Sequence, residues 1–177
     1  MDGALPYGPV SVAKPAFEDL YRDYVDRIYC FLRSQLGSAA DAEDVTSQVF
    51  MKAFEAYSRF EPRHATPAAW LFQIARNAAL DHHRRAGRRE KTERALAREP
   101  SAAVDPGAVA QERILFRELM EAVARLPDRY REVIGLRHSG LSFVEVGSLM
   151  GCSEDAAKML YHRALKALRG AVPGAGT

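Results

Sequence analysis

Residues 65–89 read ATPAAWLFQIARNAALDHHRRAGRR and combine helix-start signals, an apolar stripe and a cluster of basic residues. Thr66 is a favourable N-cap residue, and Pro67 suits the first helical position, where its missing N–H leaves no bond unmade. The apolar face consists of Trp70, Leu71, Ile74, Ala75, Ala78 and Ala79. The opposite face carries Gln73, Arg76, Asn77, His83, Arg84 and Arg85. The spacing predicts a helix with an apolar side for a core and a basic side suited to a polyanion, although a solvated surface fits that basic side equally well.

Two amphipathic helices are predicted before this segment, and no alternating strand pattern separates them. The first has apolar residues at helical spacing from Phe17 and ends near Gly37. The second is predicted to begin with Asp41 as N-cap and Asp44 as capping-box acid. Its apolar positions are Ala42, Val45, Val49, Phe50, Ala53, Phe54 and Tyr57, and its polar positions are Asp41, Glu43, Asp44, Gln48 and Lys52. The first half is therefore predicted to be an all-α bundle of three long helices, with a polar loop at residues 58–65.

The helical pattern is lost after residue 86 and returns at residue 111, which predicts a linker followed by a second helical unit. In that unit Ser142 and Glu145 form a predicted capping box, Gly151-Cys152 a tight turn, and Ser153 the cap of the next helix. That helix is predicted to bury Ala156, Ala157, Leu160, Ala164 and Leu168, and to expose Asp155, Lys158, Met159, His162, Arg163 and Lys166. Helix, glycine turn and helix indicate a helix-turn-helix, whose second helix enters the major groove. An ordinary helical hairpin is the alternative.

Charge is distributed unevenly along the chain, although the net charge is only +2. Residues 17–55 contain eight acidic and four basic residues, whereas residues 76–98 contain eight basic and three acidic residues. An acidic segment followed by a basic one indicates two different partners, one of them nucleic acid.

Several functional classes lack support in the sequence. Cys30 and Cys152 form no metal-ligand spacing, and adjacent His82 and His83 point to different helix faces. The chain has no paired-acid metal site, no HExxH and no glycine-rich phosphate loop, so we expect no enzyme activity, metal or cofactor. The N-terminus lacks signal-peptide features, and no apolar run approaches the ~20 residues that span a bilayer. We therefore expect a cytoplasmic protein.

Four segments together resemble the extracytoplasmic-function (ECF) sigma factors of the sigma-70 family. Residues 17–37, FEDLYRDYVDRIYCFLRSQLG, resemble the start of region 2, and residues 41–57, DAEDVTSQVFMKAFEAY, resemble its polymerase-docking helix. Residues 70–85, WLFQIARNAALDHHRR, are similar to the family's reader of the −10 promoter element. Residues 126–169 are similar to region 4, the reader of the −35 element.

This resemblance implies an all-α fold of two small helical domains joined by a flexible linker. Region 2 is expected at residues 16–87, the linker at 88–110 and region 4 at 111–170, with loose ends at 1–15 and 171–177. The implied function is a transcription initiation factor that binds bacterial core RNA polymerase through the β′ clamp coiled coil and the β flap. It would direct polymerase to promoter DNA, single-stranded at −10 and duplex at −35, under restraint by an anti-sigma factor.

The resemblance and the residue patterns together give three sets of candidate site residues. For polymerase they are Asp41, Asp44, Gln48 and Lys52. For −10 DNA they are Phe60, Arg63, His64, Arg76, Asn77, Arg84 and Arg85, with Phe60 expected to stack on a base. For −35 DNA, within and after a helix-turn-helix at residues 142–161, they are Ser153, Asp155, Lys158, Met159, His162, Arg163 and Lys166.

A stand-alone helix-turn-helix regulator is the main alternative. It would explain residues 141–169 but leave residues 41–85 without a role. Such a regulator binds duplex DNA alone, whereas a sigma factor requires core polymerase.

Overall fold

The computed structural model of this 177-residue chain describes residues 14–62, 65–92 and 110–171. These residues form seven α-helices and one 3-10 turn, and none of those described lies in a strand. The predicted all-α fold is therefore confirmed. Arg63, His64 and most of the predicted linker lie outside the described residues.

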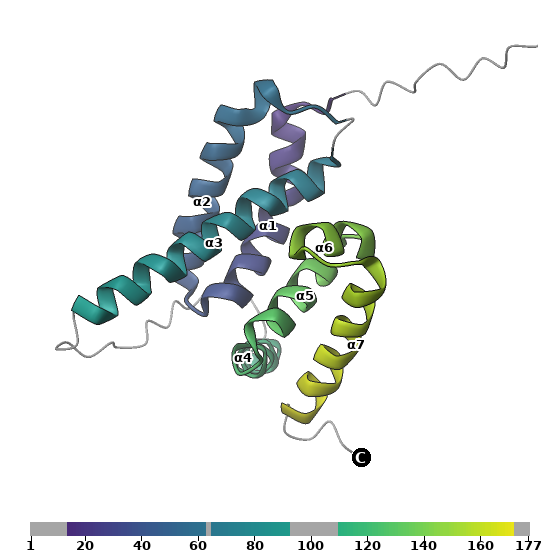
Figure 1. Ribbon diagram of the computed structural model, residues 1–177. Coiled ribbons are helices and arrows are strands. Elements are labelled where there is room, and N and C mark those ends of the chain that lie inside the picture. The colour runs from purple at the N-terminus through teal and green to yellow at the C-terminus, as the bar shows by residue number, and fades with distance from the viewer. Residues whose placement is uncertain (1–13, 63–64, 93–109, 172–177) are drawn as a thin grey trace, which may run out of the picture.

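A first unit is formed by three long helices, α1 (Phe17–Leu36), α2 (Ala39–Ala56) and α3 (Pro67–Thr92), with a 3-10 turn, η1 (Tyr57–Arg59), after α2. Figure 1 shows α3 crossing over α1 and α2. The core between them consists of apolar side chains that are at most 6% exposed: Leu20, Ile28, Phe31, Leu32, Val45, Val49, Phe50, Leu71, Phe72 and Ala75. Burial of one face of each helix fixes which polar faces remain outside.

The ends of α1 and α2 differ in how well they follow the sequence prediction. Gly37 ends α1 as predicted, with φ of 75°, and its N–H donates to the carbonyl of Arg33. The prediction that Asp41 caps α2 is wrong, because Ser38 is the N-cap and its hydroxyl accepts from the N–H of Asp41 at 3.2 Å. Asp41 instead lies in the first turn, where a carboxylate is favoured by the helix dipole.

Helix α3 begins as predicted but is longer than expected. The hydroxyl of Thr66 accepts from the N–H of Ala69 at 3.1 Å, and Pro67 is the first helical residue. The helix continues to Thr92, past the expected end of the unit at residue 87. A glycine inside a helix costs only about 1 kcal/mol relative to alanine, so Gly87 does not terminate it. Phe72, which the predicted stripe omitted, is fully buried.

The second unit consists of α4 (Ala110–Ala124), α5 (Asp128–His138), α6 (Phe143–Met150) and α7 (Glu154–Ala171). The predicted capping box is present at the start of α6, and the hydroxyl of Ser153 accepts from the N–H of Ala156 at 3.2 Å. Gly151 ends α6 in the left-handed region, with φ of 68°. Gly147 allows the turn to fold back, since a Cβ there would lie 2.7 Å from the carbonyl oxygen of Cys152. The helix-turn-helix geometry is therefore built by these local contacts.

Two apolar residues of the second unit lie on different faces from those predicted. Ala156 was expected inside but is exposed, because Ala157 and Ala164 take the buried stripe of α7. The helical spacing that resumes at residue 111 puts Leu119 among the apolar positions, but it is 44% exposed on α4, while Ala122, Val123 and Leu126 are buried. A small change of helix rotation moves such borderline positions between core and surface.

The two units lie against each other. Helix α5 packs beside α1, and α6 lies near the start of α3 (Figure 1). One continuous apolar cluster runs from the core of the first unit through Val133 and Leu136 of α5 into Val146 and Ala157 of the helix-turn-helix. The two units therefore share a single core in this structure.

Candidate nucleic-acid and protein interfaces

An exposed polar stripe runs along α2. Asp44, Gln48 and Lys52 follow one another at four-residue spacing and are all exposed, as the sequence predicted. Asp41 lies one turn earlier and is half-buried, with its Oδ1 3.6 Å from the Nε2 of His82 on α3. Asp44, Gln48 and Lys52 therefore face solvent, whereas Asp41 also faces α3.

Apolar side chains flank this stripe and were not predicted as part of it. Met51 is 64% exposed and Phe54 is 67% exposed. Helical periodicity placed Phe54 in the core, but its ring lies at the edge of the unit, 5.1 Å from the ring of Phe17. Exposed apolar residues among polar ones are typical of protein-binding surfaces. Met51 lies outside the apolar stripe that helical spacing selects on this helix, and this off-stripe position is the sequence signal that could have indicated the surface.

A small pocket lies where α2 meets α3. It is lined by Val45, Gln48, Lys52, Ala78, Asp81, His82 and Arg85. The Nδ1 of His82 is buried there and has no hydrogen-bond partner among the described residues. The pocket joins the polar stripe of α2 to the basic face of α3, so the two candidate surfaces are continuous.

The basic face of α3 is open toward its C-terminal half. Arg84 and Arg85 are exposed, and Arg84 forms an ion pair with Asp81 of its own helix, at 3.2 Å. Asn77 is exposed and its Oδ1 accepts from the Nε2 of Gln73 at 3.1 Å. An exposed amide both donates and accepts, which suits the edge of a base. Arg84, Arg85 and Asn77 thus remain available to a ligand.

Arg76 takes a different direction from the other predicted −10 residues. Its guanidinium Nε forms an ion pair with Glu132 of α5, and the two side chains are only 24% and 16% exposed. The first unit therefore donates one of its basic groups to the second unit. Sequence periodicity placed Arg76 on the polar face but did not show which partner that face meets.

The predicted stacking role of Phe60 is not supported by its position. Its side chain is 6% exposed and its ring stacks on Trp70, with centroids 4.6 Å apart and planes 28° apart. Phe60 is buried because the 3-10 turn after α2 brings the loop back onto the first turns of α3. The ring is therefore not free to receive a base in this structure.

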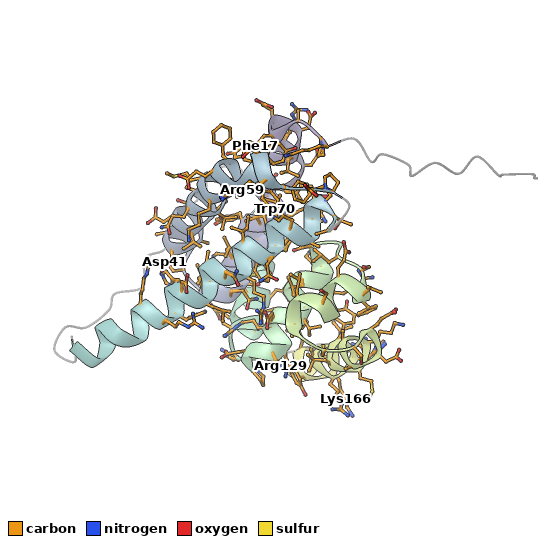
Figure 2. The ribbon with its side chains drawn as sticks, turned by 45° about the horizontal axis from the view of Figure 1, so that its top comes forward. Phe17, Asp41, Arg59, Trp70, Arg129 and Lys166 are labelled. Carbon is orange, nitrogen blue, oxygen red and sulfur yellow. The ribbon has the colours of Figure 1, made fainter. Side chains whose placement is uncertain are left out.

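The predicted −35 residues lie along the exposed side of α7. Asp155, Met159, His162, Arg163 and Lys166 are exposed, whereas Ser153 uses its hydroxyl to cap the helix. Lys158 is half-buried, and its Nζ lies 2.7 Å from Glu154 and 3.7 Å from Asp155. The hydrogen bond to Glu154 raises the pKa of Lys158 above its ordinary value. Figure 2 shows Lys166 well separated from Asp41 of the α2 stripe.

Glu145 joins the helix-turn-helix to the start of α3. Its carboxylate accepts from the backbone N–H and hydroxyl of Ser142, both at 2.8 Å, and from the hydroxyl of Thr66. Burial by itself would raise the pKa of Glu145, but these hydrogen bonds outweigh burial and leave the pKa below its ordinary value. The charged carboxylate is therefore the form that this contact favours.

Comparison with known proteins places both units in one family. The model of Sigma-70 region 2 matches residues 20–89, and that of Sigma-70 region 4 matches residues 116–168. The chain is 34% identical to the RNA polymerase sigma factor CarQ of Myxococcus xanthus, covering 89% of each chain. It is 33% identical to the ECF RNA polymerase sigma factor BldN of Streptomyces coelicolor over 89% of this chain, which spans 61% of BldN.

Solved structures show the same arrangement of helices. The sigma factor RpoE, determined in complex with the anti-sigma factor NepR from Bartonella quintana, aligns with a TM-score of 0.75 and 25% identity over 89% of this chain and 97% of RpoE. CnrH, determined in complex with the cytosolic domain of CnrY, shares the fold with a TM-score of 0.65 and 24% identity over 90% of this chain and 89% of CnrH. Among the described residues, no helix is long and apolar enough to cross a membrane.

Proposed function

Because this chain belongs to the sigma-70 family, as an ECF sigma factor, we propose that it binds bacterial core RNA polymerase and directs it to specific promoters. The carrying observation is that the region 2 and region 4 models match in order, one on each helical unit. We assign region 2 to residues 16–87, the linker to 88–110 and region 4 to 111–170, with terminal segments at 1–15 and 171–177. The family match to region 2 argues against a stand-alone regulator.

The exposed face of α2 binds polymerase in this proposal. Asp44, Gln48 and Lys52 supply polar contacts to the β′ clamp coiled coil, and Asp41 supports the same face from the first turn. Met51 and Phe54 add apolar area, which stable interfaces usually bury at their centre within a polar rim. Five of these six side chains are exposed, and Asp41 is half-buried, which supports the assignment. Region 4 contacts the β flap.

The basic face of α3 holds the melted −10 strand. Arg84 and Arg85 neutralise backbone phosphates, and Asn77 hydrogen-bonds to an unpaired base. Phe60 supports the loop from beneath by its stack on Trp70 and does not contact the strand. Arg63 and His64 remain proposed backbone contacts on residues outside the described ranges.

Helix α7 reads the −35 duplex from the major groove. Arg163 and Lys166 provide positive charge on its exposed side, with His162 and Met159 beside them. Lys158 must exchange its contact with Glu154 for a phosphate, so part of its binding energy offsets the loss of that pair. Asp155 is suited to accept a hydrogen bond from the N4 amine of cytosine.

The contacts proposed are all non-covalent, and a sigma factor is not an enzyme. We assign no catalytic residue, metal or cofactor to the chain. The RpoE and CnrH structures contain NepR and the cytosolic domain of CnrY, which supports the proposal that an anti-sigma factor restrains this protein as well. The protein acts in the cytoplasm, where polymerase and promoters are.

Run-off transcription with purified core polymerase and genomic fragments of the source organism tests this function. Sequencing of the RNA 5′ ends should reveal a set of start sites that share upstream elements and require both core and this protein. The matched control is a variant with Asp44→Arg and Gln48→Ala, which should lose these transcripts. Transcripts from core alone, or duplex binding that needs no polymerase and yields no transcript, would contradict the proposal.

A further inference from the structure

An apolar side chain stands in the middle of the polar face that α7 turns to solvent. Met159 is 55% exposed, and the exposed residues Asp155 and Arg163 lie four positions before and after it. Residues four apart share one face of a helix and are about 6 Å apart along its axis, so these three form a continuous row. Ala156, three residues before Met159, is also exposed. The row therefore presents a hydrogen-bond acceptor, an apolar step and a donor, in that order.

Packing inside the second unit does not account for the position of Met159. The buried side of α7 is formed by Ala157 and Ala164, and residues two apart, such as Ala157 and Met159, lie on nearly opposite sides of a helix. The ring of Phe143 on α6 packs against Tyr161, with centroids 5.6 Å apart. A single exposed apolar residue is common on proteins, but this one lies among the residues assigned to the −35 duplex. That duplex is therefore the partner that would cover it.

The charge of this face suits DNA. Arg163 and Lys166 are exposed on it, which favours a polyanion over an apolar protein surface or a second copy of the chain. Lys158, the residue before Met159, is half-buried, and its Nζ lies 2.7 Å from Glu154. Because that ammonium group is already paired, the side chain that meets the groove at the middle of the row is Met159.

Thymine is the base that matches an apolar side chain. In the major groove its C5-methyl group is the apolar group that a base pair presents, whereas the other bases present hydrogen-bond donors and acceptors there. A thioether is only a weak acceptor and donates nothing, so it cannot satisfy those groups. The unbranched methionine side chain also adapts its shape to small apolar partners. Contact with Met159 therefore favours thymine over the other bases.

We propose that Met159 is a specificity-determining residue, which selects a thymine in the −35 element through contact with its methyl group. The thymine lies between the bases opposite Asp155 and Arg163. This inference rests on the proposed −35 role of α7 and adds the base that the middle of the helix selects. One methyl group buried in such a contact contributes about fourfold in affinity.

Replacement of thymine by deoxyuridine tests this contact, because it removes the methyl group and keeps the hydrogen-bonding edge of the base. Promoter duplexes are first selected by core polymerase with the full chain, from a pool with a randomised upstream element. Each thymine of the selected element is then replaced in turn, and the affinity of the holoenzyme is measured by fluorescence anisotropy. The wild-type protein should lose about fourfold in affinity at one thymine. Met159→Ala should bind the thymine duplex more weakly and should not distinguish it from the deoxyuridine duplex.

Further variants separate methyl recognition from other effects. Met159→Leu should keep the preference for thymine, and Met159→Gln, which is polar and of similar size, should lose it. Val144→Ala truncates an apolar side chain that is 60% exposed on α6, and this matched control should keep the wild-type ratio of affinities. At the same position, 5-methylcytosine should bind better than cytosine with the wild-type protein but not with Met159→Ala.

Three results would overturn the inference: selected elements that share no thymine, equal wild-type affinity for thymine and deoxyuridine duplexes, or a thymine preference that survives in Met159→Ala. Weaker binding of Met159→Ala to core polymerase with an unchanged thymine preference would assign the side chain to polymerase and overturn it as well. In all of these cases core-dependent selection leaves the proposed function standing. If core polymerase with the full chain selects no duplex, that result contradicts the proposed function itself and removes the −35 role on which the inference rests.

Discussion

The ring of Phe60 stacks on the ring of Trp70, with their centroids 4.6 Å apart, and thereby attaches the loop after α2 to the first turn of α3. Phe60 belongs to the predicted polar loop, and Trp70 belongs to the start of the predicted basic helix. Their contact holds Phe60 against the first turn of α3 and keeps its ring only 6% exposed.

Phe60→Ala should destabilise region 2 by about 3 kcal/mol, because a buried phenylalanine is replaced by a cavity. Urea denaturation followed by circular dichroism measures the loss. Phe54→Ala, which removes a ring that is 67% exposed, should change stability by less than about 0.5 kcal/mol. A Phe60→Ala protein as stable as wild type but defective only with melted DNA would mean that the ring stacks on a base after all.

Asp44→Arg combined with Gln48→Ala should weaken binding to core polymerase at least tenfold while leaving the melting temperature unchanged. Both side chains are exposed on α2, where substitutions seldom affect stability. The arginine replaces a negative charge of the proposed interface by a positive one, which opposes binding to a surface complementary to the carboxylate. Titration of fluorescent sigma with core measures the affinity. Glu43→Arg, on a different side of α2, is the control, and equal affinity for all three proteins would remove the docking face from α2.

Arg163→Ala and Lys158→Ala should affect −35 binding in different ways. If Arg163 hydrogen-bonds to a base, its loss should cost about 1–3 kcal/mol and relax one base preference. Loss of a Lys158 phosphate contact should weaken all sequences alike and reduce the salt dependence by about one charge. Holoenzyme binding to promoter variants across a salt series separates the two effects, and no change in either variant would show that α7 is not the reading helix.

Acidification should weaken the folded state through Glu145. Because hydrogen bonds from Thr66 and Ser142 leave its pKa below the ordinary value of 4.5, the carboxylate contributes stability that is fully present above the unfolded-state pKa. This contribution is lost as pH falls through the lower, folded-state pKa. Glu145→Gln should therefore melt at a lower temperature than wild type at neutral pH, and the difference should shrink as the pH is lowered. Glu118→Gln on α4 is the control, and a pH-independent difference for Glu145→Gln would contradict the carboxylate role.

Local sequence patterns predicted most of the fold because the relevant interactions are local. Thr66 and Pro67 start α3, Gly37 ends α1, and Ser142 with Glu145 opens α6, each through contacts within a few residues. The prediction for Asp41 was wrong because Ser38 offered an equally suitable hydroxyl three residues earlier. The type of capping residue can therefore be predicted, but its position shifts by about one turn when two candidates compete.

Site residues were harder to predict wherever long-range packing decides their role. Periodicity placed Arg76 on a polar face, but only the approach of α5 shows that Glu132 covers it. Phe60 was predicted to stack on a base from the polar loop, yet its ring stacks on Trp70. Asn77, Arg84 and Arg85 were placed correctly on the exposed face because none of the helices that the structure describes covers them. Their contact with DNA stays a prediction.

Permanganate reactivity of unpaired thymines at a promoter identified by run-off transcription is the most direct test that this chain opens DNA with α3. Thymines in the −10 region should react only when core polymerase and this protein are both present. Asn77→Ala with Arg84→Ala should still bind core but lose this reactivity, and a pre-melted template should restore only part of the transcription. Reactive thymines with core alone, or wild-type reactivity with the double variant, would show that the melted strand is held elsewhere.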